Sequence, residues 1–581
     1  MANFFTENND RLFHFKNFEI KEIVSLLEKN YTEHEKYEEA PENYNDAMDT
    51  YRRLLEVAGQ ITAEVIDPLS ESVDLEGAHF NGGDVQYASG TIKGMETLRQ
   101  AGLSGGTLPR MYGGLNLPNI INNIIIEMVS EADASLQNIY GLQDIGVTIY
   151  KFGNEDQKAR MLPRFCSGEV TGAMDLTESE AGSDLQAVQL KATFDEKENC
   201  WRLNGVKRFI TNGLAQVHLV LARSEEGTAD GRGLSMFLYV RDENMKIRRI
   251  EDKLGIHGSP TTELQFNNAK AELVGKRKLG LIRYVMSLMN GARLGIAIQA
   301  LGVAQAAYNK ALKYALERKQ FGKKIIEFPA VYDMLTNNKM DIELSRSLIY
   351  KTTLFVDELD ILEHILEHDK EKLSPEKLKE YRERVKKLTR RAALFTPLSK
   401  YYATEMGNKV CYDAVQVHGG SGYMTDFAVE RHSRDVRITN IYEGTTQLQV
   451  VAAIGGILTK ELTEEYDKFR RKAAGHEGEF QDAYTTLVKY EKLLDEAIDK
   501  VHEKKDKSFS DYIARTLVDM GLAIYLAYVL LDEAKKNSNK ALMAQKYVVE
   551  RLSQVEVWYQ RVMEADETTI RNYEQLLEIN V

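Results

Sequence analysis

The sequence predicts a mainly helical protein with a small β domain in its middle, and three observations support this. The chain has 581 residues, 43% apolar and 28% charged, which is a globular balance and more chain than one domain holds. It has only 9 prolines, which fits long helices. Short β-type runs replace the helical spacing in one central stretch. We therefore expect a helical domain (1–166), a β domain (167–278), a helical bundle (279–466) and a helical C-terminal extension (467–581).

Apolar residues at spacings of three and four predict the helices of the first and third segments. The predicted helices cover residues 42–64, 120–134, 297–318, 329–364, 374–402 and 405–417. Residues 356–391 carry many opposite charges four positions apart, which predicts a solvated helical hairpin.

Short runs bounded by turn residues predict strands in the second segment. They lie at residues 189–194, 218–223, 235–240 and 262–266. Their spacing is typical of a small antiparallel barrel or sandwich.

The extension is charged and helical, and its most apolar run covers residues 509–534. Asp519 and Asp532 interrupt this run. A membrane-spanning helix needs about 18 or more consecutive apolar residues. We therefore expect a core helix and no membrane span.

Charge and cysteine content exclude several classes of function. The net charge is −13 without a long basic run, which argues against a nucleic-acid partner. Cys166, Cys200 and Cys411 are too few for a disulfide framework and lack metal-ligand spacing. The first residues show neither signal-peptide nor transit-peptide character. We expect a cytoplasmic protein in a reducing compartment, without a metal.

Two polar, glycine-containing clusters lie in the predicted β domain. Residues 176–184 (LTESEAGSD) supply hydroxyls and backbone N–H groups that suit an anion or a polar ring, although a plain polar turn is as good an interpretation. Residues 205–213 (GVKRFITNG) end in Asn-Gly, for which a β-hairpin is the simpler explanation.

Two further clusters lie in the predicted helical bundle. Residues 317–322 (ERKQFG) end a long helix, where cations commonly complement the helix dipole. Residues 416–423 (QVHGGSGY) form a glycine-rich turn that lets a phosphate approach, and residues 430–447 follow. Glu443 lies where a helix could begin, so it is either a cap or a carboxylate presented for proton abstraction.

In their order and spacing, these clusters resemble the acyl-CoA dehydrogenase family over about residues 80–455. The resemblance implies an acyl-CoA dehydrogenase-like fold: an N-terminal helical domain, a central β domain and a C-terminal helical bundle. The tail after about residue 467 resembles the extension of larger members.

The resemblance also implies the chemistry. Members bind FAD and remove a hydrogen from each of Cα and Cβ of an acyl-CoA. By similarity, Glu443 takes the α-proton and flavin N5 accepts the β-hydride. The ribityl 2′-hydroxyl and the backbone N–H of Glu443 would hold the thioester carbonyl. Some members carry the base one residue before the arginine at position 293, where this chain has Ala292, so Glu443 is the candidate.

Site residues carry over position by position. The implied FAD contacts are Met174, Leu176, Thr177, Gly182, Ser183, Phe209, Ile210, Thr211, Arg318, Gln320, Phe321, Gln416, Gly419, Gly420, Thr445 and Gln447. Five of them would reach the FAD pyrophosphate and adenine across a subunit interface, namely Arg318, Gln320, Gln416, Gly419 and Gly420, while Thr445 and Gln447 would lie beside the dinucleotide. The implied substrate contacts are Ser183, Asn290, Arg293 and Gly444.

Three positions depart from the family pattern. Phe209 stands where tryptophan is common, Asn290 where many members have aspartate, and Phe328-Pro329 where a polar pair is often found. Phe209 should keep the ring packing but lose an indole donor, whereas the other two departures weaken the implied adenosine contacts.

The implied partners are an acyl-CoA, an electron-transfer flavoprotein and further copies of the chain, as a homodimer or homotetramer. The resemblance also implies a role in fatty-acid β-oxidation. An acyl-CoA oxidase, in which oxygen reaches the reduced flavin, is one alternative. Another is a dehydrogenase for a sulfur-containing or branched acyl group, since residues 255–261 and the tail resemble the larger members. A remote alternative is a non-catalytic helical interaction protein.

Overall fold

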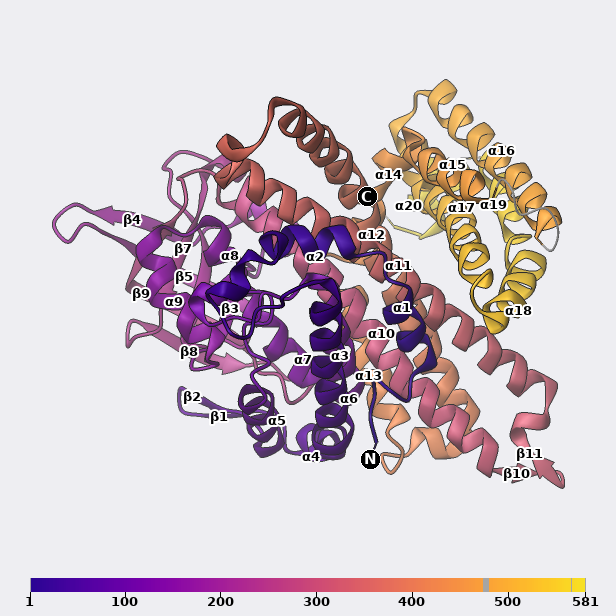
Figure 1. Cartoon of the computed structure of the whole chain (residues 1–581), viewed down its shortest axis with the longest axis horizontal. Helices are drawn as coiled ribbons and strands as arrows, with labels where there is room; N and C mark the ends of the chain where they lie inside the picture. Colours follow the sequence, from indigo (N-terminus) through magenta and orange to yellow (C-terminus); the bar gives the residue numbers. More distant parts are fainter. Residues whose placement is uncertain (1, 474–479, 566, 580–581) are drawn as a thin grey trace. The chain divides into compact units, whose positions relative to one another are not determined.

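A computed structural model describes residues 2–473, 480–565 and 567–579 (Figure 1). The chain forms two compact units. Unit 1 comprises Met1–Lys339 and Ala403–Glu443, and unit 2 comprises Met340–Tyr402 and Gly444–Val581. The segment that the sequence suggested as one helical bundle therefore contributes residues to both units.

The first part of unit 1 is helical. Its helices are α1 (Asn9–Asn17), α2 (Lys21–Leu27), α3 (Tyr44–Ile61), α4 (Asp67–Glu76), α5 (Ser89–Gln100), α6 (Asn119–Ala132), α7 (Ala134–Tyr140), α8 (Asp144–Phe152) and α9 (Glu155–Cys166). A small hairpin, β1 (His79–Asn81) with β2 (Asp84–Gln86), joins α4 to α5.

Helix α6 is the buried centre of this helical part. Its residues from Ile120 to Ala132 are all buried. The side chain of Arg11 from α1 is fully buried against it, in ion pairs with Glu127 and Glu131. These ion pairs hold α1 against α6, because a buried carboxylate without its arginine partner would be costly.

The central part of unit 1 is the predicted β domain. Its strands are β3 (Gly172–Asp175), β4 (Lys191–Asp195), β5 (Cys200–Thr211), β6 (Val217–Arg223), β7 (Leu234–Val240), β8 (Met245–Ile250) and β9 (Thr261–Val274). The pairings β6–β4, β4–β5, β5–β9, β9–β7 and β7–β6 close into a ring, mostly antiparallel as expected. The β3–β6 pair is parallel, which the sequence had not suggested.

The Asn212-Gly213 turn after β5 does not make a β-hairpin. Strand β5 pairs with β4 and β9, and the chain leaves the turn to enter β6, which pairs with β3, β4 and β7. The hairpin interpretation of this cluster is therefore wrong. The side chain of Asn212 instead donates to the carbonyl of Gly172 at the start of β3, at 3.0 Å.

Long helices follow the β domain. They are α10 (Met286–Glu317), α11 (Pro329–His368), α12 (Pro375–His418) and the shorter α13 (Val429–Val436). Strands β10 (Lys319–Gln320) and β11 (Lys323–Lys324) form a small hairpin after α10. Helix α12 is continuous where the sequence suggested two helices, and it contributes to both units.

Helix α10 crosses α6 at close range. A Cβ placed on Gly302 of α10 would lie 2.6 Å from the carbonyl oxygen of Glu127, so this crossing requires a residue without a side chain. The contact fixes α10 against the helical part of unit 1.

Unit 2 joins the middle of α11 and α12 to the C-terminal helices. These are α14 (Thr446–Leu458), α15 (Glu461–Ala473), α16 (Gln481–Lys504), α17 (Lys507–Ala534), α18 (Ser538–Lys546), α19 (Gln554–Met563) and α20 (Thr568–Leu576). One hydrophobic cluster includes residues such as Leu344 of α11, Phe395 of α12 and Tyr525 of α17. The extension therefore shares a core with α11 and α12.

Helix α17 is long and apolar enough to cross a membrane by length and composition. Its apolar window is 89% buried inside the structure, among the other helices of unit 2. This burial accounts for its apolar character, because a central helix of a helical domain is apolar on every side. It agrees with the core helix that the sequence predicts there.

Candidate functional site

Glu443 lies on a short strained segment between α13 and α14. Its φ angle is 53°, in the left-handed region that residues with a side chain avoid, and Gly444 follows with φ of 90°. The Glu443 side chain is half-buried. A residue held in this conformation by its surroundings is typical of functional sites.

Tyr442, the residue before Glu443, anchors the segment. Its hydroxyl lies 3.0 Å from Oδ1 of Asn138 on α7 and also contacts Oε1 of Gln299 on α10. Gln299 Nε2 donates to Asn138 Oδ1 at 2.9 Å and to the Ala134 carbonyl at 3.0 Å. Both carboxamides are buried. No sequence pattern marks Asn138 or Gln299, since a single Asn or Gln on a helix forms no motif.

Arg293 of α10 is the charged partner of Glu443. Burial lowers the pKa of Arg293, and the nearby Glu443 carboxylate opposes that shift by Coulomb attraction. The structure thus brings together two predicted residues that lie 150 positions apart in the chain. Asn290 lies on the same helix, but its side chain is outside the described part of the structure.

The first two clusters lie side by side in the β domain. The backbone N–H of Arg208 donates to the carbonyl of Thr177 at 2.9 Å, directly before Phe209. The register of β5 on β9 shifts between Lys207 and Ile210, and Phe209 has φ of 60°. This β-bulge turns the Phe209 ring outward, where it is 51% exposed.

The neighbours of Phe209 differ in what they can offer a ligand. Ile210 is buried in the β-domain core, whereas Thr211 is half-buried. Met174 and Leu176 pack against the other core of this part of the unit. Of these four residues, Thr211 alone has both a hydroxyl and partial exposure.

A buried ion pair that no sequence pattern predicts lies beneath these clusters. Lys207 is fully buried and donates to Glu178 Oε1 at 2.9 Å and to the Leu176 carbonyl at 2.8 Å. Glu178 also accepts from the backbone N–H groups of Gln189 and Leu190. Burial lowers the pKa of Lys207 and Glu178 opposes this shift. Both residues stood inside the quoted motifs, but their pairing depends on strand register.

The third and fourth clusters also lie together, at one end of α10 and α12. The Tyr314 ring on α10 stacks on His418 of α12, with centroids 4.3 Å apart. Arg318 follows Tyr314 by one helical turn, and Gly419 directly follows His418. Within the described residues, no hydrogen bond, ion pair or ring contact joins this pair of clusters to the pair in the β domain.

The ends of these two clusters are open to the surface. Arg318, Gln320 and Gln416 are exposed, and Phe321 at the tip of the β10–β11 hairpin is 94% exposed. The Arg318 guanidinium makes no side-chain hydrogen bond or ion pair with any residue that the structure describes. An exposed arginine and an exposed aromatic ring at one hairpin are suited to contact another molecule.

The arrangement fits a flavin dinucleotide. A Cβ placed on Gly182, Gly419 or Gly420 would meet no atom within 4 Å, so backbone at these positions borders open space. The outward Phe209 ring suits packing against a planar ring system, and Arg318 suits a phosphate. FAD has both a planar ring system and phosphates for groups of these kinds.

Three of the expected contact residues belong to unit 2. Gly444 directly follows Glu443, and its carbonyl accepts hydrogen bonds from Lys400 and, at 2.9 Å, from Gln449. Thr445 precedes α14 as its N-cap residue, without a side-chain capping bond, and Gln447 is exposed.

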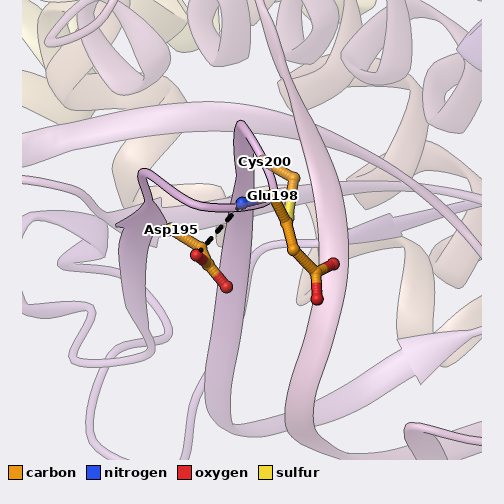
Figure 2. A group of neighbouring side chains, drawn as sticks. All are labelled: Asp195, Glu198 and Cys200. Carbon is orange, nitrogen blue, oxygen red and sulfur yellow. Dashed lines mark hydrogen bonds between the residues drawn. The ribbon is translucent and has the colours of Figure 1, made fainter.

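One further group in the β domain has metal-ligand residue types. Asp195, Glu198 and Cys200 meet at the turn between β4 and β5 (Figure 2). Arg202 forms ion pairs with both carboxylates, and Asp195 accepts the backbone N–H groups of Lys197 and Glu198. These bonds explain the cluster as a closed turn, and we assign no ion to it.

Sequence comparison identifies matches along most of the chain. Residues 48–169, 173–269 and 282–361 with 382–454 match the N-terminal, middle and C-terminal domains of acyl-CoA dehydrogenases. Residues 461–565 match a further domain described as "Acyl-CoA dehydrogenase C terminal".

Individual relatives agree with these matches. The chain is 30% identical over 490 residues to 3-methylmercaptopropionyl-CoA dehydrogenase of Ruegeria pomeroyi, covering 79% of each chain. A structure from Acidaminococcus fermentans, described for its electron transferring flavoprotein, is 30% identical with a TM-score of 0.59, covering 69% of this chain and 96% of that one. An acyl-CoA dehydrogenase from Bacillus anthracis complexed with FAD shares the fold, with 23% identity, a TM-score of 0.73, and coverage of 89% and 88%.

Proposed function

The chain belongs to the acyl-CoA dehydrogenase family, and we propose that it converts an acyl-CoA thioester to the trans-2-enoyl-CoA, with Glu443 as the base. It is an oxidoreductase, and FAD is its cofactor. When bound, FAD supplies the acceptor for the hydride that leaves Cβ. The side chains and backbone of this chain supply the base and the groups that hold the thioester.

The observation that carries the proposal is the meeting of Glu443 with Arg293 beside the anchored Tyr442. A thioester α-proton is far less acidic than a carboxylic acid, so the carboxylate needs help to remove it. The backbone N–H of Glu443 is the proposed donor to the thioester carbonyl, where negative charge grows as the α-proton leaves. Because donor and base belong to one residue, the left-handed backbone conformation of Glu443 fixes both together.

Cofactor contacts are proposed for the residues carried over from the family pattern. The flavin ring would be held by Thr177, Gly182, Ser183, Phe209 and Thr211. The open groups at the end of α10 and α12, with Arg318 foremost, would hold the dinucleotide of a second subunit. Support for a second subunit comes from the exposure of the β10–β11 hairpin.

We propose an electron-transfer flavoprotein as the electron acceptor. The similar Acidaminococcus fermentans structure, whose title names such a flavoprotein, supports this choice. Steady-state peroxide formation from acyl-CoA without an added acceptor would indicate an oxidase instead.

The decisive experiment replaces Glu443 by Gln in the FAD-loaded enzyme. Flavin bleaching by acyl-CoA should fall by several orders of magnitude, while the flavin content and thioester binding stay unchanged. Glu226→Gln, an exposed loop residue, is the matched control and should bleach normally. Near-normal bleaching in Glu443→Gln would refute the assignment of the base. A purified protein without flavin colour would favour the non-catalytic alternative.

The acyl group remains a separate proposal. The similarity to a 3-methylmercaptopropionyl-CoA dehydrogenase supports an unusual, short acyl group over a long unbranched one. Bleaching rates across CoA esters of different length, branching and sulfur content test this directly.

For the extension we propose a packing role. Its helices share a hydrophobic core with α11 and α12, so it covers helical surface that would otherwise be open to another subunit. We therefore propose a homodimer as the assembly. Removal of residues 467–581 should change the mass in solution, and an unchanged oligomer would argue against this role. The three free, buried cysteines support a cytoplasmic, reducing location.

A further inference from the structure

Two opposite charges, Lys207 of β5 and Glu178 of the loop after β3, meet beneath the proposed flavin contacts of the β domain. The Lys207 side chain is fully buried. Its ammonium donates to Glu178 Oε1 at 2.9 Å and to the Leu176 carbonyl at 2.8 Å. These two acceptors belong to the residues on either side of Thr177, so one ammonium holds the chain before and after this proposed flavin contact.

The backbone also holds Glu178 in place. Its Oε2 accepts the N–H of Gln189 at 2.8 Å, and its Oε1 accepts the N–H of Leu190 at 3.0 Å. Only 12% of the Glu178 side chain is exposed. Hydrogen bonds of this kind favour the ionised form of a carboxylate. The pair therefore consists of one positive and one negative charge at fixed places.

One further carboxylate faces Lys207. Burial lowers the pKa of Lys207, and Glu178 and then Asp175 oppose this shift. Asp175 of β3 is fully buried, and its Oδ2 lies 2.9 Å from Nδ1 of His218 on β6. The other ring nitrogen of His218 lies 3.0 Å from the carbonyl of Ala215. Asp175 is thus engaged by His218, and Glu178 is the carboxylate that Lys207 binds within the described part of the chain.

Strand β5 connects this ion pair to the second group of proposed flavin contacts. Phe209 follows Lys207 by two residues, within the bulge in the register of β5 on β9. Between them, the backbone N–H of Arg208 donates to the Thr177 carbonyl at 2.9 Å. The bonds of Lys207 and Arg208 therefore join the two groups of flavin contacts, and Thr177 lies at the junction.

Folding alone gives a poor explanation of this buried pair. Taking two charges out of water costs free energy that their attraction often fails to offset, and apolar residues of similar size commonly serve stability as well. Charges near a flavin have a second effect. Reduction brings negative charge to the ring system, which a nearby cation stabilises and a nearby anion destabilises.

We propose that Lys207 and Glu178 are positioning residues that set the reduction potential of the bound flavin. Lys207 raises the potential and holds Thr177 in place for the ring, and Glu178 lowers the potential. The proposal rests on the proposed flavin contacts of Thr177 and Phe209.

The test uses the FAD-loaded enzyme and needs no acyl-CoA. Stepwise chemical reduction against a reference dye gives the reduction potential of the flavin. Lys207→Met should lower this potential and Glu178→Gln should raise it. Each change should alter the equilibrium constant for flavin reduction by about tenfold, which is about 30 mV for two electrons. The variant that combines both changes loses both charges, so its potential should return toward that of the parent.

The two shifts should also depend on pH in different ways. Glu178 keeps its two backbone donors in Lys207→Met, so it is ionised at pH 8 and the loss of potential is complete there. In Glu178→Gln, burial lowers the pKa of Lys207 with less to oppose it. The gain in potential over the parent should therefore be largest at pH 5.5 and should fade as the pH rises and Lys207 loses its proton.

Titration of FAD into the apoprotein gives an independent readout. Lys207→Met should weaken FAD binding by about tenfold, because the segment around Thr177 loses a charged hydrogen bond that holds it. The matched controls are Lys191→Met and Glu196→Gln, since both side chains are exposed in the same β domain. Both controls should keep the potential and the FAD affinity of the parent.

Shifts of the same sign in Lys207→Met and Glu178→Gln would refute the charge assignment. So would reduced thermal stability with an unchanged potential, which is the result that a purely structural ion pair gives. Should Lys207→Met fail to fold, the sign and the pH dependence of the shift in Glu178→Gln decide alone.

Two further variants test the contacts on which the proposal rests. If Thr177→Val and Phe209→Ala both keep the FAD affinity and the flavin absorbance of the parent, the proposed flavin contacts are wrong and this proposal fails with them. If these variants change the flavin while Lys207→Met and Glu178→Gln do not, the contacts stand and the charge assignment alone fails. Dehydrogenation at Glu443 is tested separately, because none of these measurements involves a thioester.

Discussion

The hydroxyl of Tyr442 lies 3.0 Å from Oδ1 of Asn138, so the residue beside the proposed base is fixed to helix α7. We predict that Tyr442→Phe lowers kcat for flavin reduction by about tenfold to a hundredfold, because loss of this anchor lets Glu443 move away from the substrate. The carboxamide oxygen of Gln299, which loses its contact with the Tyr442 hydroxyl, should also cost about 1–3 kcal/mol of stability. Stopped-flow bleaching and thermal unfolding measure the two effects.

The control for this change is Tyr412→Phe, since Tyr412 is 64% exposed on α12. It should affect neither measurement. A Tyr442→Phe enzyme that is destabilised yet reduces its flavin at the normal rate would show that the hydrogen bond serves folding alone.

Arg293 should set the acid limb of the pH–rate profile. A nearby cation stabilises the ionised form of Glu443, which is the form that accepts the α-proton. Arg293→Gln should therefore move the acid limb of flavin reduction to higher pH, by about one unit. Lys313→Gln, an exposed change on the same helix, removes an equal charge and should leave the profile in place. An unshifted pH–rate profile in Arg293→Gln would show that Arg293 does not stabilise the ionised form of Glu443.

The sequence located the clusters that make up the site, but it did not show which of them meet. Thr177 lies beside Arg208 because of a backbone bond across the sheet, and Arg318 lies near Gly419 because Tyr314 stacks on His418. Strand register and helix packing decide such pairings, and neither leaves a local pattern. The predicted strands and most helices follow from residue periodicity alone.

Failures of sequence reasoning have equally specific causes. Asn212-Gly213 has the composition of a hairpin turn, yet β5 finds its partners elsewhere in the sheet. Asn138, Gln299 and Lys207 act through buried bonds to distant residues. The role of such a single polar residue can be recognised only when the structure shows its hydrogen-bond partners.

Asp435 should make stability depend on pH. It is buried on α13 and accepts the backbone N–H of Ile256 at 2.5 Å. Burial raises its pKa to about 7, helped by Asp74 and Asp133 and opposed by that hydrogen bond and by Arg431. In the unfolded chain this group ionises near its ordinary value of about 3.9. The folded state therefore holds the proton longer, and stability is lost as the pH rises from about 4 through 7.

The variant Asp435→Asn keeps an acceptor for Ile256 but cannot ionise. Its stability relative to the parent should rise between pH 5 and 7, by up to about 1.4 kcal/mol per pH unit, and should level off above pH 8. Thermal unfolding midpoints across pH 5–9 test this. Asp426→Asn, an exposed change, should follow the parent curve. A constant difference at all pH values would mean that Asp435 is already ionised in the folded protein.

Phe321 should be a contact between subunits. It forms the tip of the β10–β11 hairpin with φ of 50°, it is 94% exposed, and Arg318 lies three residues before it. A large apolar side chain that is this exposed in one chain is typical of a surface that another molecule covers. Phe321→Ser should therefore shift the mass measured by light scattering toward one chain and lower the flavin retained after gel filtration. The size of the loss should grow as the protein is diluted, since it depends on subunit association.

Leu542→Ser, equally apolar and 68% exposed on α18 in unit 2, should change neither quantity. Full flavin content in a Phe321→Ser protein that has become a monomer would show that one chain binds FAD without the neighbouring hairpin.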